Sequence, residues 1–154
     1  MKKLLFAIGI VCLALTFSLG LTGCETDPPP PETTYSTQSA PVALTSGSWS
    51  DGYLASESAE VWYSFYAIAN TTYYVFWNDA YAGNSSKTAD IYVTSHFNDT
   101  VLESAMDSAY STAKTINRNT SGTVKLRVHT RLASTSRTGT FAIGYNTTNT
   151  RPTN

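Results

Sequence analysis

Hydrophobic and polar positions alternate with a period of two in many segments of this chain, which is the pattern of β-strands with one buried face. The densest such segment is residues 61–79, VWYSFYAIANTTYYVFWND, where aromatic and β-branched residues form two arms joined at Asn70 and Thr71. Such residues suit a pleated surface, and nothing here repeats at helical spacing. We therefore expect two central strands around which the domain is built.

Shorter alternating segments lie on both sides of these arms and are separated by turn residues. We expect further strands near residues 42–45, 49–54, 88–95, 110–116, 123–131 and 139–145. The pair Asp51-Gly52 is interpreted as a tight hairpin turn, Asn98-Asp99 as a second turn, and residues 102–109 as a turn rather than a helix. Seven or eight short strands predict an all-β protein, an antiparallel β-sandwich over residues 42–146.

Residues 1–23 have the composition of an export signal, with a basic start at Lys2-Lys3 followed by an apolar run. The run ends in Leu21-Thr22-Gly23-Cys24, which resembles the lipobox of bacterial lipoproteins. This resemblance implies transfer of diacylglycerol to the sulfur of Cys24 and cleavage before that residue. The alternative is an ordinary signal peptide with a chance cysteine.

Residues 24–41 are predicted to form a disordered, proline-rich linker. They contain four consecutive prolines, which favour extended polyproline II and bury little apolar area. Such a linker would hold the domain away from a bilayer; the alternative is a proline-rich peptide ligand. The polar residues 147–154 are expected to be a disordered tail.

Cysteine usage and charge limit the possible partners. The chain has two cysteines, and loss of residues 1–23 would leave only Cys24, so no disulfide could form within the domain. The same cleavage leaves 8 Lys+Arg against 11 Asp+Glu, a formal charge of −3. This balance does not favour nucleic acid, and no polybasic segment would bind anionic lipid. We expect membrane contact through the lipid anchor alone, in the cell envelope, on the outer leaflet of the cytoplasmic membrane or on the outer membrane.

The order of several motifs resembles a known family. In chain order they are WYSF at 62–65, TTY at 71–73, ADIYV at 89–93, GTV at 122–124 and GTFAI at 139–143. Together they are similar to the bacterial pre-peptidase C-terminal domain, over residues 44–145. The resemblance implies a small jelly-roll-like β-sandwich that accompanies secreted proteases and occurs in other exported proteins. No protease precedes it in this sequence, which favours a stand-alone binding or adhesion role.

The chain offers little for catalysis. Only His96 and His129 are available as imidazole bases, and neither lies in a His-Glu-x-x-His motif. No Gly-x-Ser-x-Gly elbow is present, and the serines cluster in turns. His129 alternates outward beside Lys125 and Arg127 and is expected to be solvated. We do not expect an enzyme.

Calcium is the one cofactor that the family resemblance suggests, because its collagen-binding members bind the ion through carboxylates. Asp79 follows one predicted strand and Asp90 begins the next, so the two could meet at one end of the sandwich. They are weak candidates for a structural calcium site. The alternative is that each carboxylate caps a turn.

Aromatic side chains give the last candidate site. If one face of each central arm fills the core, the alternation leaves four aromatic residues on the other face, namely Trp62, Tyr66, Tyr74 and Phe76. Exposed aromatics present rigid area for a sugar or a protein partner; alternatively, a loop over residues 95–109 covers them. The expected function is a lipid-anchored, exported, non-catalytic module that binds a protein or a glycan. The alternatives are a structural envelope lipoprotein without its own ligand, or an accessory domain protein with a weak calcium site.

Overall fold

The computed structural model describes residues 36–82, 86–106 and 112–153, so the predictions for Cys24 and most of the linker lie outside the described residues. The described strands are β1 (Val42–Ala43), β2 (Trp49–Leu54), β3 (Glu60–Ala67), β4 (Thr72–Asn78), β5 (Ile91–Phe97), β6 (Thr100–Met106), β7 (Lys114–Asn117), β8 (Gly122–Thr130) and β9 (Gly139–Asn146). A short 3-10 turn, η1 (Ala80–Ala82), follows β4. Within these residues, no helix is long and apolar enough to cross a membrane.

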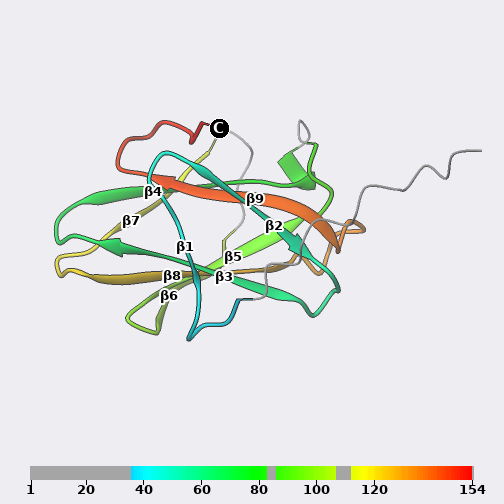
Figure 1. The fold of residues 1–154 in the computed structure, drawn as a ribbon, viewed down its shortest axis with the longest axis horizontal. Coiled ribbons are helices and arrows are strands. Elements are labelled where there is room, and N and C mark those ends of the chain that lie inside the picture. The colour runs from blue at the N-terminus through cyan, green and yellow to red at the C-terminus, as the bar shows by residue number, and fades with distance from the viewer. Residues whose placement is uncertain (1–35, 83–85, 107–111, 154) are drawn as a thin grey trace, which may run out of the picture.

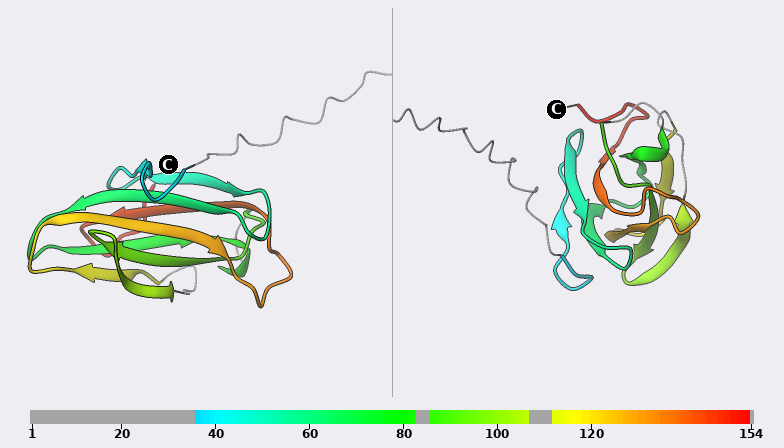
Figure 2. Two further views of the ribbon diagram at one scale, coloured as in Figure 1. Left: turned by 90° about the horizontal axis from the view of Figure 1, so that it is seen from below. Right: turned by 90° about the vertical axis from the view of Figure 1, so that its right-hand side faces the viewer.

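The strands form two sheets that lie face to face (Figures 1 and 2). The larger sheet has the order β1-β3-β8-β5-β6 and the smaller one β2-β9-β4-β7. Every pairing of named strands is antiparallel except the short parallel contact of β1 with β3. The predicted all-β sandwich is confirmed, with nine strands in the described residues rather than seven or eight.

Side-chain alternation decides which residues fill the core. In β8, Val124, Leu126 and Val128 are fully buried, whereas the residues between them are only partly buried. Across the core, the rings of Phe65 in β3 and Tyr145 in β9 stack with centroids 4.1 Å apart and so join the two sheets. Full burial of such a side chain contributes roughly 1.5–3 kcal/mol.

Two local predictions were wrong. Asp51 and Gly52 lie inside β2 and make no turn. A Cβ at Gly52 would overlap the ring of Phe141 and the hydroxyl of Tyr63, so the glycine is needed for close packing rather than for a turn. The segment interpreted as a turn over residues 102–109 begins within β6. The turn at Asn98-Asp99 is confirmed by the positive φ values of both residues, 45° and 68°.

The two central strands follow each other in sequence but do not pair. β3 belongs to the larger sheet and β4 to the smaller one, so the turn at Asn70 carries the chain from one sheet to the other. Asn70 has a φ of 59°, the left-handed conformation that asparagine tolerates. Outward-pointing residues of β3 and β4 therefore lie on opposite faces of the sandwich.

Segments at both ends of the domain, predicted to be disordered, pack against it. The Trp62 N–H donates to Ser36 Oγ at 2.7 Å, which fixes the end of the linker beside β3. At the other terminus, the Thr153 N–H donates to the Gly47 carbonyl at 3.0 Å. Backbone groups outside the strands thus find partners in residues 36–41 and 147–153, and the disorder of the linker and the tail stays a prediction.

Candidate functional site

The four aromatic residues predicted to form one strip lie on two different faces. Trp62 and Tyr66 are on the outer face of the larger sheet, and Tyr74 and Phe76 are on the outer face of the smaller sheet. The prediction of a single strip is wrong because it required β3 and β4 to share a face.

Two of the four aromatics are also covered. Trp62 is only 7% exposed, and its ring lies 5.1 Å from that of His96, a residue of the segment 95–109 expected as cover. Phe76 is 1% exposed and lies beneath Arg151, whose guanidinium carbon is 5.9 Å from the ring centroid. Tyr66, by contrast, is 64% exposed. The covered rings stabilise the fold and are not open to a ligand.

The two histidines lie on the outer face of the larger sheet. His129 is half-buried, not solvated as expected, and its Nε2 is 3.2 Å from Thr94 Oγ1. Burial chiefly lowers the pKa of both His96 and His129, and the positive charge of Arg127 lowers it further. Both rings are therefore neutral at pH 7, and they stabilise the sheet as packed aromatic groups.

Acidification should lower the stability of the domain in the range below pH 6.5. The pKa of His96 is lower in the folded chain than in the unfolded one, so the unfolded chain binds more protons as the pH falls through this window. Lys125 and Arg127 oppose protonation of His96, while Asp99 favours it. We expect the melting temperature to fall between pH 7.5 and pH 5, and to fall less in His96→Gln. The fall that persists in this variant is expected from His129, whose pKa is also lowered.

Asp99 does not contribute to the change in melting temperature over this pH range. Hydrogen bonds from Lys125 and Gln38 lower the pKa of Asp99, so its contribution is lost only below pH 3.8. Identical pH dependence of melting in the unmodified chain and in His96→Gln would contradict the prediction for His96.

Asp79 and Asp90 are both buried at one end of the sandwich, where the Ala80 N–H donates to the Ala89 carbonyl. Asp79 Oδ2 accepts a hydrogen bond from the Ile91 N–H at 3.1 Å. Asp90 Oδ2 lies 3.9 Å from Arg131 Nη1. In the part of the chain that is described, no group of three or more His, Cys, Asp or Glu side chains could hold a metal. These contacts favour the alternative in which the carboxylates hold the turn, and calcium binding stays a prediction.

We expect the same melting temperature in millimolar calcium and in chelator. Extracellular modules bind calcium at roughly 10⁻⁴–10⁻³ M, so a true site would add about 1 kcal/mol and raise melting by several degrees. A rise of that size in the unmodified chain that is lost in Asp90→Asn would instead establish a calcium site.

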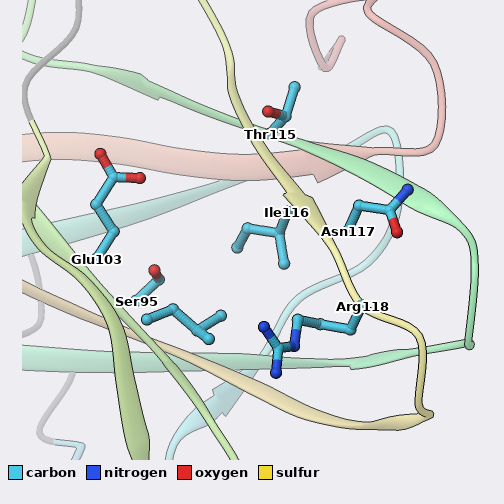
Figure 3. Close-up of a pocket in the computed structure, with 7 residues that line it drawn as sticks. Ser95, Glu103, Thr115, Ile116, Asn117 and Arg118 are labelled. Carbon is cyan, nitrogen blue, oxygen red and sulfur yellow. The ribbon is translucent and has the colours of Figure 1, made fainter.

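A polar pocket of about 210 Å³ opens between β6 and β7 (Figure 3). It is lined by Ser95, Leu102, Glu103, Thr115, Ile116, Asn117 and Arg118. β6 and β7 are the last strands of their sheets, so among the described residues no further strand closes this side of the sandwich. The pocket therefore lies where the two sheet edges meet.

Ser95 occupies a core-facing position of β5, between the buried residues Val93 and Phe97. It is 1% exposed and lines the pocket. The hydroxyl at this position thus places a polar group on a wall of the pocket that the pattern of β5 would otherwise make apolar.

β6 bends beside Ser95. The pairing of β5 with β6 changes register between Val93 and Ser95 and again between Ser95 and His96, and Ser95 is paired with Glu103 between the two shifts. Such bulges interrupt the ladder, turn side chains in new directions and are frequent beside functional sites. The irregularity gives Glu103 its place on the wall of the pocket.

Arg118 forms the opposite wall. Its guanidinium carbon lies 5.2 Å from the centroid of the Phe97 ring, and its buried Nε has no hydrogen-bond partner in the described structure. Figure 3 shows the guanidinium directed toward the side on which Ser95 lies, with Glu103 at the far end. Glu103 Oε1 is 4.0 Å from Lys114 Nζ, which offsets its charge. The pocket thus has a cationic end and an acceptor end.

A second hollow, of about 410 Å³, lies beside Thr37, Gln38, Ser39, Asp99 and Lys125. Its polar groups already bind each other: Lys125 Nζ and Gln38 Nε2 both donate to Asp99 Oδ1, at 2.7 and 3.2 Å. This hollow offers a ligand fewer free groups than the pocket between β6 and β7.

Sequence reasoning did not find the pocket. Its lining comes from β5, β6 and β7 and from the residue after β7, and only tertiary structure brings these together. One signal was present, because Ser95 interrupts the inward apolar series of β5.

Neither a known protein family nor a curated protein matches the sequence. Among solved structures, the chain is similar to the pre-peptidase C-terminal domain of a collagenase from Bacillus anthracis, with a TM-score of 0.50 and 11% identity. The similarity covers 68% of this chain and 93% of that domain. At this identity the likeness shows the fold alone, and it supports the β-sandwich of pre-peptidase C-terminal type that the motifs suggested.

Proposed function

We propose that this chain is an exported, lipid-anchored module without catalysis of its own, which binds a protein or glycan partner through the pocket between β6 and β7. The observation that carries this proposal is the pairing of a buried hydroxyl, at Ser95, with an unpartnered guanidinium nitrogen, at Arg118. Buried polar groups are nearly always satisfied in folded proteins, so a donor left unsatisfied beside a cavity, as at Arg118 Nε, favours a ligand site.

Other features support a pocket at the sheet edge over a site on a sheet face. The Trp62 and Phe76 rings are covered, so the outer faces offer less continuous aromatic surface than the sequence suggested. The pocket is also polar, which suits a partner recognised by hydrogen bonds.

The arrangement around Ser95 argues against hydrolysis. A serine nucleophile needs a base within about 2.6–3.2 Å. Ser95 points into the sandwich, whereas His96 packs against Trp62 on the outer face, so the adjacent imidazole is directed away from the hydroxyl. Binding without chemistry is the function that these residues support.

Export and anchoring complete the proposal. The basic start, the apolar run and the Leu-Thr-Gly-Cys motif favour lipidation of Cys24 and a place in the cell envelope. The proline-rich segment after Cys24 would act as an extended spacer that holds the domain away from the membrane surface.

A structural envelope lipoprotein without a ligand is the second candidate. The observation that favours it is the cover on both outer faces, where the linker end packs on β3 and residues 151–153 pack near β2. Covered outer faces are expected of a domain that binds no partner.

The two candidates differ in a binding assay. The purified chain is applied to an array of extracellular-matrix proteins and glycans, beside Arg118→Gln and the matched control Arg137→Gln. Arg137 is a surface residue paired with Glu57 at 3.0 Å, away from the pocket lining. We expect a partner that binds the unmodified chain and the control but not Arg118→Gln. No partner at all, or equal binding by all three proteins, would refute the proposed site.

A further inference from the structure

We propose that the pocket between β6 and β7 binds a sugar that carries a carboxylate, such as a hexuronate; this inference rests on the proposed function and specifies its ligand. The carboxylate would lie against Arg118 and the ring hydroxyls against Ser95 and Glu103.

The cationic end selects the charged group. An arginine side chain has five N–H donors in a planar fork and no acceptor, so its best partner is a planar anion with two oxygens. The Arg118 Nε is buried without an acceptor, and the stacking of the guanidinium carbon over Phe97 holds the fork in place. A carboxylate entering the pocket would meet a donor whose solvation has already been lost.

The other end selects hydroxyl groups. Glu103 only accepts hydrogen bonds, so it requires donors from the ligand. Ser95 can both donate and accept a hydrogen bond. Thr115 and Asn117 border the pocket, but their side chains lie on the outer face of the smaller sheet, where Thr115 is paired with Tyr74 and Asn117 Nδ2 donates to Thr72 Oγ1 at 2.8 Å. The hydroxyl groups of a sugar ring can both donate and accept hydrogen bonds, as Ser95 and Glu103 require. An acidic peptide side chain offers a carboxylate alone.

The size of the pocket limits the ligand to about one ring. Its volume of about 210 Å³ is below the roughly 300–1,000 Å³ of sites for drug-sized molecules. Because no aromatic ring is among the described lining residues, recognition would depend on hydrogen bonds and charge. A single carboxylated sugar unit, free or at the end of a chain, fits these limits.

The test is ligand-observed saturation-transfer NMR with the full chain in detergent. The probes are methyl β-D-glucuronide and, as the uncharged match, methyl β-D-glucoside. We expect the glucuronide to bind at least about tenfold more tightly than the glucoside, because a charge-assisted pair is lost with the latter. Arg118→Gln should remove this preference, Arg118→Lys should reduce it, and Arg137→Gln should leave it unchanged.

Ser95→Ala provides a second measurement if Arg118→Gln fails to fold. It removes one hydroxyl from the pocket and should weaken glucuronide binding several-fold while leaving the thermal melt intact or improved. Equal binding of glucuronide and glucoside, or a preference that survives in Arg118→Gln, would overturn the assignment of the carboxylate to Arg118.

Failure of the sugar assignment can be distinguished from failure of the proposed function. If binding of an array partner depends on Arg118 but the glucuronide neither binds nor competes, the sugar class is wrong and the binding site stands. Competition by an acidic peptide but not by the glucuronide would lead to the same conclusion. If no partner depends on Arg118, both proposals fail.

Discussion

Replacing Trp77 with alanine should lower the free energy of unfolding by about 3–5 kcal/mol. Trp77 is 2% exposed, points into the core from β4, and is paired with Ile143 of the neighbouring strand β9. Removing the indole from the core loses its transfer free energy and leaves a cavity that the two sheets cannot fully close. Denaturant melts measure the loss directly.

Two aromatic residues on the outer face serve as controls. Trp62→Ala should cost less, about 1–3 kcal/mol, because its ring is covered on the outer surface rather than enclosed between the sheets. Tyr66→Ala should stay within about 0.5 kcal/mol, since its side chain is largely exposed. A loss at Trp62 equal to that at Trp77 would show that the outer face is as closely packed as the core.

Cys24→Ala should abolish labelling by radioactive fatty acid and move the protein to the soluble fraction or leave its signal uncleaved. The thiol of Cys24 is the only side chain of the Leu-Thr-Gly-Cys motif that can form a thioether to diacylglycerol. Cys12→Ala is the matched control, because Cys12 lies within the apolar run and should be dispensable. Normal acyl labelling of Cys24→Ala, or loss of labelling in Cys12→Ala, would reject the lipoprotein assignment.

The sequence was a good guide to strands and to their buried faces. In β8, the three inward residues Val124, Leu126 and Val128 were predicted correctly because the period of two is a local property of the chain. The turn at Asn98-Asp99 was equally local.

Local sequence patterns could not show which strands pair with each other. Alternation indicated that Trp62 and Phe76 both point away from the core, but it could not show that β3 and β4 belong to different sheets. The role of Gly52 was missed for the same reason, since the rings that require it come from distant strands.

The candidate site depends on tertiary structure still more strongly. Ser95, Glu103 and Arg118 meet because β6 and β7 end their sheets on the same side of the sandwich. The sequence alone predicted only that Ser95 points inward. By itself, this would have indicated a polar residue in the core rather than a pocket.

The most direct measurement is a map of amide chemical shifts in the full chain, with and without the partner found on the array. We expect the largest changes at Ser95, Glu103 and residues 115–118, around the pocket between β6 and β7. Changes concentrated instead around Trp62 and Tyr66, with the pocket residues unaffected, would place the binding surface on the outer face of the larger sheet and contradict the proposed site.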